Sequence, residues 1–279
     1  MDTAGSVRVR RALPAPLGPL AVVLGLVAMY VVATLARPLG LRPLLVLSEV
    51  GLVLPGLLLL AVFAVPLRDG LALGSIGLRR LALSVAAGAS LWAASLGLLE
   101  LQYMLWRPPS GYLEAFRALH EALRPADALD ALVSVTAIAL APAVCEELLF
   151  RGVVLPSFLK SFGPAGAVGA SAALFGLIHL DFTQPGAPVL YRVPFAFVVG
   201  VGLGTLRLLT SSLPPAIAAH ATLNTITLLA TPLIDDPEAP MPDPKPLLGV
   251  SLLLAGGALT ALLLWKSRAP GGTPAEPGR

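Results

Sequence analysis

Two adjacent carboxylates interrupt an apolar stretch near the middle of the chain. The segment "PAVCEELLFRGVVLP", residues 142–156, contains Glu146, Glu147 and Arg151. Glu147 and Arg151 are four residues apart, so on a helix they can form an ion pair that lowers the cost of both charges. Glu146 points about 100° away from Glu147 and has no such partner on its own helix. We therefore expect Glu147 and Arg151 to be structural and Glu146 to be available for chemistry.

Two later segments repeat this helical spacing with other polar side chains. Phe175 and His179 are four apart in "FGLIH", and His220 and Asn224 are four apart in "HATLN". Residues at this spacing lie on one face of a helix. A carboxylate assisted by an imidazole can act as general base for water, while an imidazole and an amide on another helix can donate hydrogen bonds to an oxyanion. Together with Glu146, these residues suit hydrolysis of a peptide bond.

Other functions use the same residue types. Glu146, His179 and His220 could hold a divalent metal such as zinc, because Glu and His both ligate zinc, although the sequence has no HExxH motif. Buried Glu and His also serve proton-coupled transporters. A single His inside a membrane is often only a packing residue, so a non-catalytic immunity or scaffold protein with the same fold is a further alternative.

The composition shows what kind of fold must position these residues. Of the 279 residues, 56% are hydrophobic and only 13% are charged, against roughly 25% charged in an average soluble domain. Apolar runs of about 18 or more residues cross the bilayer, and in lipid they must be helices. We expect an all-α membrane protein, a polytopic bundle of about eight transmembrane helices, with spans near 17–36, 44–67, 81–103, 131–160, 164–181, 193–210, 213–233 and 247–265.

The depth of the polar residues in these spans agrees with a common site. Glu146 lies about 21 Å along the helix before the turn "SFGPAG", and His179 lies about 22 Å along the helix after Pro164. The two side chains are therefore expected at the same level, with His220 and Asn224 close to it. Glu49 and Glu100 stand near span ends, so we expect them to reach the interface.

We expect one polytopic membrane domain over residues 17–265, with a catalytic core at about 130–230. A cytoplasmic N-terminal segment, 1–16, precedes it and a disordered cytoplasmic tail, 266–279, follows it. Within the domain, residues 110–127 predict an amphipathic helix at the interface, with an apolar face made of Leu113, Phe116, Leu119 and Leu123.

The distribution of charge bears on orientation and on partners. Lys and Arg of the short loops predict that both termini are cytoplasmic, with Arg37 and Arg42 as the exception on the outer side. The basic residues are scattered rather than gathered in a stripe, which excludes a nucleic-acid partner. The single cysteine, Cys145, excludes an internal disulfide and a cysteine-based structural zinc site.

The three segments, in this order, resemble the CAAX-protease and bacteriocin-processing (CPBP, or Abi) family of intramembrane proteases. The family pattern EExxxR, FxxxH and HxxxN is matched by "EELLFR", "FGLIH" and "HATLN". The resemblance implies that Glu146 activates water with His179 assisting, and that His220 and Asn224 stabilise the oxyanion. It also implies that Glu147 and Arg151 hold the site together. A glutamate mechanism and a metal-dependent one both fit these residues.

The resemblance further implies an intramembrane endopeptidase whose substrate is a membrane-associated peptide or protein. Eukaryotic members of the family cleave prenylated C-termini, whereas bacterial members are associated with peptide maturation, bacteriocin immunity and surface-protein sorting. Short loops and an Ala-, Leu-, Gly- and Arg-rich sequence indicate a multi-pass protein of a bacterial inner (plasma) membrane. A CaaX substrate is therefore not assumed, and the lipid bilayer is the other expected partner.

Overall fold

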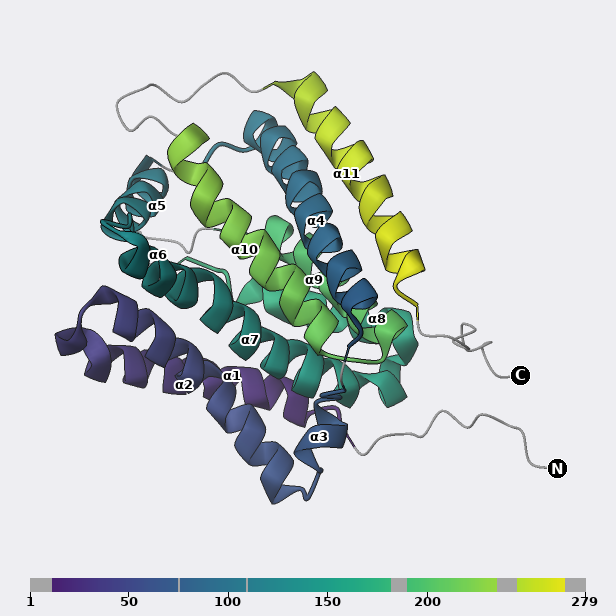
Figure 1. The fold of residues 1–279 in the computed structure, drawn as a ribbon. Helices are drawn as coiled ribbons and strands as arrows, with labels where there is room; N and C mark the ends of the chain where they lie inside the picture. The colour runs from purple at the N-terminus through teal and green to yellow at the C-terminus, as the bar shows by residue number, and fades with distance from the viewer. Residues whose placement is uncertain (1–11, 75, 109, 182–189, 235–244, 269–279) are drawn as a thin grey trace.

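A computed structural model of the chain describes residues 12–268, apart from 75, 109, 182–189 and 235–244. These residues fold into a bundle of helices (Figure 1). In chain order they are α1 (Leu17–Ala36), η1 (Arg37–Leu39), α2 (Leu41–Val62), α3 (Leu67–Gly70), α4 (Leu78–Leu105), α5 (Ser110–Ala122), α6 (Ala128–Val135), η2 (Thr136–Leu140), α7 (Ala141–Glu147), η3 (Leu148–Val154), α8 (Leu155–Leu177), α9 (Val193–Thr210), α10 (Pro214–Ile234) and α11 (Pro246–Lys266).

The prediction of an all-α polytopic membrane protein is confirmed. Six helices among the described residues are long and apolar enough to cross a membrane, and one of them is the continuous stretch Ala128–Leu177. This stretch bends sharply at Gly163, where φ is 65°. A left-handed φ suits glycine, and Pro164 directly after it cannot continue the hydrogen bonding of the preceding turn. The stretch therefore covers both the fourth and the fifth of the expected spans, and α10 corresponds to the seventh.

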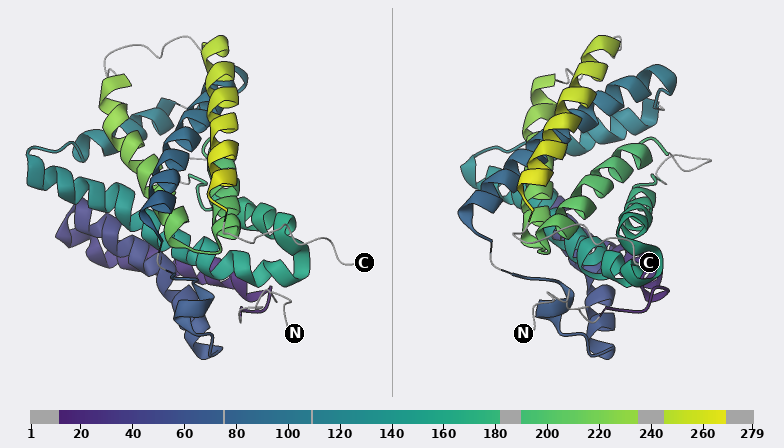
Figure 2. Two further views of the ribbon diagram at one scale, coloured as in Figure 1. Left: turned by 45° about the vertical axis from the view of Figure 1, so that its right-hand side comes forward. Right: turned by 90° about the vertical axis from the view of Figure 1, so that its right-hand side faces the viewer.

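The polar segments lie where two groups of helices meet. α7 packs against α2 on one side and against α10 on the other, while α4 packs against both α10 and α11. Figure 1 shows α7 and α10 passing through the middle of the bundle, between the α1 and α2 pair and the α4 and α11 pair. The two rotated views of Figure 2 show the α4 and α11 pair beside α10 from other directions. The central helices thus carry Glu146 and His220.

The helix that carries Glu146 contains two wider, π-helical turns. Each of them ends two residues before a proline, η2 before Pro142 and η3 before Pro156. A proline lacks the N–H for an ordinary helical hydrogen bond and its ring collides with the carbonyl four residues earlier, so a π-turn before it relieves the clash. Turns of this kind are frequent at functional sites. In this chain they enclose α7, the short helix with both carboxylates.

A close backbone approach joins α4 to the helix of His220. A Cβ atom added at Gly88 would overlap the carbonyl oxygen of Ala219. Glycine at this position therefore lets the two backbones touch, which is a common way for helices to associate in membranes. Because Ala219 precedes His220, the contact fixes the position of the imidazole relative to α4.

The N-terminus of α2 is tied to the junction of α5 and α6. Arg42 forms an ion pair with Asp130 at 2.8 Å, and its Nε donates a hydrogen bond to Ser134 Oγ at 2.9 Å. Ser134 Oγ in turn donates to the carbonyl oxygen of Leu123 at 2.9 Å. Asp130 balances the charge of Arg42, so this arginine is a weak indicator of orientation.

Some of the expected features fall wholly or partly outside the described residues. The amphipathic helix expected over residues 110–127 corresponds to α5, which begins at Ser110 and ends at Ala122. Leu123, directly after α5, is buried. The side chains of Leu113 and Phe116 are outside the described part, as are residues 1–11 of the N-terminal segment and residues 269–279 of the tail.

Candidate active site

A buried ion pair lies next to the candidate base. Arg151 Nη1 donates a hydrogen bond to Glu147 Oε1 at 2.7 Å, and the two side chains are 1% and 0% exposed. Arg151 Nη2 donates to the carbonyl oxygen of Gly200 on α9 at 3.1 Å. The guanidinium carbon lies 4.5 Å from the centre of the Phe175 ring on α8. The ion pair expected from the spacing thus forms, and Arg151 also links three helical segments through it.

Glu147 has a second partner that its spacing along the helix does not reveal. His220 Nδ1 lies 3.0 Å from the same Oε1 atom of Glu147. On the other edge of the ring, His220 Nε2 lies 3.8 Å from Glu146 Oε2. The imidazole from α10 therefore stands between the two adjacent carboxylates of α7. Glu147 holds His220 by a hydrogen bond, whereas Glu146 is separated from it by a short gap.

These contacts fix the protonation of His220 at one nitrogen. A carboxylate oxygen only accepts hydrogen bonds, so Nδ1 carries the proton that it donates to Glu147. Nε2 carries a proton as well only when the ring is positively charged. In that form His220 can donate a hydrogen bond toward Glu146 or toward a substrate oxygen beside it. In the neutral form Nε2 can accept one.

His179 is oriented by its own helix. Its Nδ1 lies 2.8 Å from the carbonyl oxygen of Phe175, to which it donates, so Nε2 of the neutral ring is left as an acceptor. The Phe175 ring contacts both imidazoles, with centroid distances of 4.9 Å to His179 and 5.9 Å to His220. Phe175 thus stands against three site residues, including Arg151. In the described part of the chain no hydrogen bond joins His179 to Glu146.

Asn224 lies one turn after His220 on α10 and is half-buried. Its amide makes no hydrogen bond within the part of the chain that the structure describes. An amide with free donors one turn from an imidazole can bind a developing negative charge. The structure therefore gathers Glu146, Glu147, Arg151 and His220 in direct contact, with Asn224 and His179 adjoining through α10 and Phe175.

The donors for a metal ion do not meet in this arrangement. Among the described residues, no three His, Cys, Asp or Glu side chains lie close enough together to hold one. Glu146 and His220 approach each other to 3.8 Å, whereas His179 contacts the Phe175 ring and makes no ion pair with either carboxylate within the described residues.

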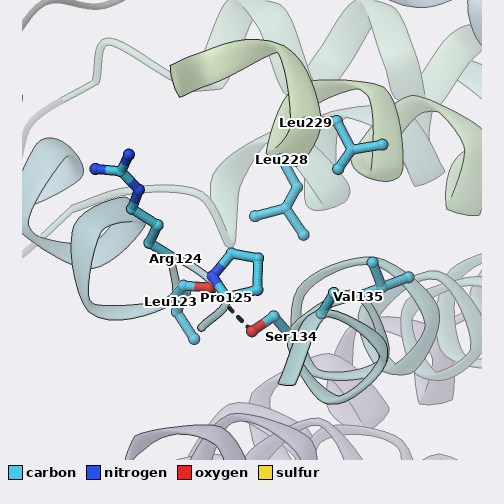
Figure 3. Close-up of a pocket in the computed structure, with 8 residues that line it drawn as sticks. Leu123, Arg124, Pro125, Ser134, Val135, Leu228 and Leu229 are labelled. Atoms are coloured by element: carbon cyan, nitrogen blue, oxygen red, sulfur yellow. Dashed lines mark hydrogen bonds between the residues drawn. The ribbon is translucent and has the colours of Figure 1, made fainter. Parts of the chain in front are cut away.

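A cavity of about 230 Å³ lies apart from these residues, between α10 and the junction of α5 and α6 (Figure 3). Leu228 and Leu229 line it from α10, opposite Val135 and Ser134. The hydroxyl of Ser134 donates a hydrogen bond to the carbonyl oxygen of Leu123, which the dashed line in Figure 3 marks. Arg124 stands at the edge of the cavity, and none of the candidate site residues lines it.

The sequence assigned no function to Glu49, and the structure places part of its carboxyl inside the bundle. Its Oε2 atom is buried and has no hydrogen-bond partner in the described part of the chain, so the carboxyl does not reach the interface as expected. α2 packs against α7 along this stretch. Glu100, by contrast, accepts a hydrogen bond from the backbone N–H of Lys245, just before α11.

Comparison with known families gives one match to the part of the chain that holds this site. Residues 128–226 match the family model described as type II CAAX prenyl endopeptidase Rce1-like. The matched segment begins at α6 and ends within α10, and so includes all of the candidate residues from Glu146 to Asn224. Comparisons with curated proteins and with solved structures give no significant match.

Proposed function

From the premise that residues 128–226 make this chain a member of the Rce1-like family of CAAX-type endopeptidases, we propose that it hydrolyses a peptide bond of a membrane-associated peptide or protein. The observation that carries the proposal is the position of His220, 3.0 Å from Glu147 and 3.8 Å from Glu146 inside an apolar bundle. Buried ionisable groups are costly in a membrane, so three of them in contact indicate a functional site.

Glu146 is the general base in this mechanism. Its carboxylate has no hydrogen bond to protein groups in the described part of the chain and faces His220 across a gap of 3.8 Å. A water molecule can bridge groups at such a separation. Glu146 removes a proton from this water as its oxygen attacks the substrate carbonyl carbon. His179 assists by accepting a hydrogen bond at Nε2, the ring atom that its contact with Phe175 leaves available.

His220 and Asn224 bind the oxyanion that this attack produces. With Nδ1 held by Glu147, a positively charged His220 directs Nε2–H away from the ion pair of Glu147 and toward the reacting carbonyl oxygen. The Asn224 amide supplies a second donor from the next turn of α10. Two donors fixed before the reaction lower the energy of the charge that develops in the transition state.

Glu147 and Arg151 keep this arrangement in place. Arg151 neutralises Glu147, and the pair is anchored to α9 through Gly200 and to α8 through the Phe175 ring. The second carboxylate oxygen of Glu147, Oε2, is buried and has no hydrogen bond within the described part of the chain, so the contacts of the pair all pass through Oε1. Oε1 of Glu147 therefore serves two purposes at once, binding Arg151 and orienting His220.

The proposal is tested with purified protein in liposomes and two matched, internally quenched peptides that end in a CaaX sequence, one farnesylated and one not. The wild-type protein cleaves at least one of the two peptides. Glu146→Gln lowers kcat at least about 10³-fold, because the variant lacks both the general base and the negative charge of its carboxylate. Glu121→Gln, on the exposed side of α5, is the matched control and keeps full activity. Wild-type rates in the Glu146→Gln protein would contradict the mechanism.

The same preparation separates the substrate classes and the two hydrolytic mechanisms. Cleavage of the farnesylated peptide alone indicates that a lipid anchor is needed, and equal cleavage of both indicates that it is not. Metal content is measured on the active protein before and after treatment with a chelator. Stoichiometric zinc together with loss of activity on chelation would replace the glutamate mechanism by a metal-dependent one.

A further inference from the structure

The cavity of about 230 Å³ lies between the same two helical stretches that carry the candidate site (Figure 3). Leu228 lines it from α10, eight residues after His220, and Val135 lines it from the continuous stretch that reaches Glu146 eleven residues later. At 1.5 Å per residue these intervals are about 12 Å and about 16 Å. Asn224 lies on α10 between His220 and Leu228, one turn from each. The cavity thus adjoins the site along the line where α10 packs against η2 and α7.

The walls of the cavity suit an apolar ligand. Apart from Arg124 and Ser134, the side chains that line it are apolar: Leu123, Pro125, Ala131, Val135, Leu228 and Leu229. Ser134 Oγ accepts a hydrogen bond from Arg42 Nε and donates one to the carbonyl oxygen of Leu123, both at 2.9 Å. An apolar cavity of about 150 Å³ is large enough for benzene. This one therefore has room for a side chain as large as leucine, methionine or phenylalanine.

The cavity is open to the outside, and a positive charge stands at its edge. Leu228 is buried whereas Leu229 is 60% exposed, so the lining runs from the interior of the bundle to its surface. The Arg124 side chain is 66% exposed, and its ion pair with Glu121 spans 3.7 Å, which is longer than a hydrogen bond. A guanidinium has five N–H donors, so Arg124 can bind a second carboxylate.

An apolar cavity with an arginine at its edge is complementary to an apolar group that has an anion directly beside it. A peptide presents this combination at its C-terminal residue, where the side chain and the α-carboxylate are attached to the same carbon. We infer that the cavity is a specificity site of the proposed peptidase: it takes the apolar side chain of the substrate's C-terminal residue, and Arg124 pairs with the α-carboxylate. The inference rests on the proposed function, which puts the scissile bond beside Glu146 and His220.

The distance between the two sites sets the position of cleavage. An extended chain rises about 3.3 Å per residue, so a separation of about 12–16 Å corresponds to about four residues. The substrate lies over the contact between η2 and α10, and its released C-terminal fragment is about three to five residues long.

Such a site discriminates by the size and by the charge of the last residue. A difference of one methylene in an apolar enzyme pocket changes kcat/KM by about tenfold or more. A peptide that ends in leucine is therefore cleaved with a kcat/KM at least about tenfold higher than one that ends in alanine. Ion pairs of exposed side chains are weak, so replacing the α-carboxylate by a carboxamide lowers kcat/KM by about two- to fivefold.

The test uses three peptides that differ only at the C-terminus: leucine acid, alanine acid and leucine amide. The fragments released by the protein in liposomes are identified and timed by mass spectrometry. Ala131→Leu extends a side chain into the cavity and should reduce the preference for leucine over alanine to about twofold or less. Ala128→Leu, an exposed position of α6 outside the lining, is the matched control and keeps the wild-type preference.

The carboxylate contact has a variant of its own. Arg124→Gln should abolish the difference between leucine acid and leucine amide, mainly through a higher KM for the acid. Arg107→Gln is the matched control, because Arg107 is another exposed arginine, stacked on the Tyr103 ring, and does not line the cavity. This control keeps the preference for the acid.

A binding readout needs neither turnover nor a change in the cavity. The Glu146→Gln protein is irradiated with a peptide whose last residue is a diazirine analogue of leucine, and the attachment point is mapped by mass spectrometry. We expect attachment within residues 123–135 or at residues 228–229, where the lining lies. Unlabelled leucine acid should compete more strongly than leucine amide.

The outcomes separate this inference from the proposed function. Cleavage by the wild-type protein together with an unchanged preference in Ala131→Leu, or in Arg124→Gln, overturns the inference and leaves the proposed function standing. Attachment of the diazirine peptide outside the lining also overturns it, as does an absence of competition, and either result would leave the cavity to a lipid chain. If the wild-type protein cleaves no peptide, the proposed function fails, and the attachment map alone decides whether the cavity binds a peptide terminus.

Discussion

His220 Nδ1 lies 3.0 Å from Glu147 Oε1, which joins α10 to α7 in the interior of the bundle. The same oxygen accepts a hydrogen bond from Arg151 at 2.7 Å. Glu147 is thus both the counterion of a buried arginine and the acceptor that sets the orientation of an imidazole. The two tasks can be separated experimentally, because Arg151 and His220 reach Glu147 from different helices.

Glu147→Gln is expected to destabilise the protein by about 3–5 kcal/mol, because Arg151 then has no counterion in a buried position. In the double variant Glu147→Gln, Arg151→Met the unpaired charge is gone and much of the stability returns. Cleavage does not return, since a neutral amide is a weaker hydrogen-bond acceptor for His220 Nδ1–H than the carboxylate is. Thermal unfolding in detergent and kcat measure the two effects.

The exposed pair Glu121 and Arg124, 3.7 Å apart on the surface, provides the control for the Glu147 series. Glu121→Gln should change the free energy of unfolding by less than about 1 kcal/mol. Recovery of both stability and activity in the Glu147→Gln, Arg151→Met protein would mean that Glu147 has no role beyond neutralising Arg151.

Asn224→Ala is expected to lower kcat by about 10²–10³-fold, the usual effect of losing one oxyanion donor. KM and the unfolding temperature should change little, because the amide has no hydrogen bond within the described part of the chain. Thr225→Val, on the next residue of α10, is the matched control: its hydroxyl donates to the carbonyl oxygen of Ala221 rather than to the site. A rise in KM at constant kcat would assign Asn224 to substrate binding instead.

Phe175→Leu removes the ring that contacts Arg151, His179 and His220. We expect a loss of about 1–3 kcal/mol in stability from the missing contacts and the smaller side chain, together with a lower kcat. Phe162→Leu is the comparison, because Phe162 is 55% exposed near the bend of α8. Equal effects of the two substitutions on kcat would show that the Phe175 ring does not position the imidazoles.

Gly88→Ala forces a methyl group against the carbonyl oxygen of Ala219 and should separate α4 from α10. We expect a destabilisation of about 1–3 kcal/mol and a displaced His220, hence reduced cleavage. Gly257→Ala on α11 has open space around the added methyl group and should be neutral or slightly stabilising. Unchanged unfolding temperature and activity in Gly88→Ala would contradict the close contact between the two helices.

Local spacing was sufficient to predict several parts of the site. The four-residue interval between Glu147 and Arg151 fixes their ion pair, because it depends only on helix geometry. The same interval places Phe175 against His179. The turn between the fourth and fifth spans could be predicted from Gly163 and Pro164, whose backbone preferences are local.

Contacts between helices could not be obtained in this way. Spacing along one helix could not show which side chains of other helices the two carboxylates meet; in the structure His220 Nε2 lies 3.8 Å from Glu146 Oε2. The π-turn before Pro142 shifts the helical phase of α7 relative to the residues that precede it. A small rotation of this kind decides which residue of a neighbouring helix a side chain meets, and no periodicity in one segment encodes it.

The sequence by itself determined the helical membrane fold and the set of polar residues inside it. Lipid forces apolar runs into helices, and an ionisable residue within such a run has a free-energy cost that marks it as a functional candidate. Only the tertiary structure decided which of these residues meet. It joined Glu147 to both Arg151 and His220. The physical reason is that partners on different helices depend on how those helices pack and rotate, which is a property of the whole bundle.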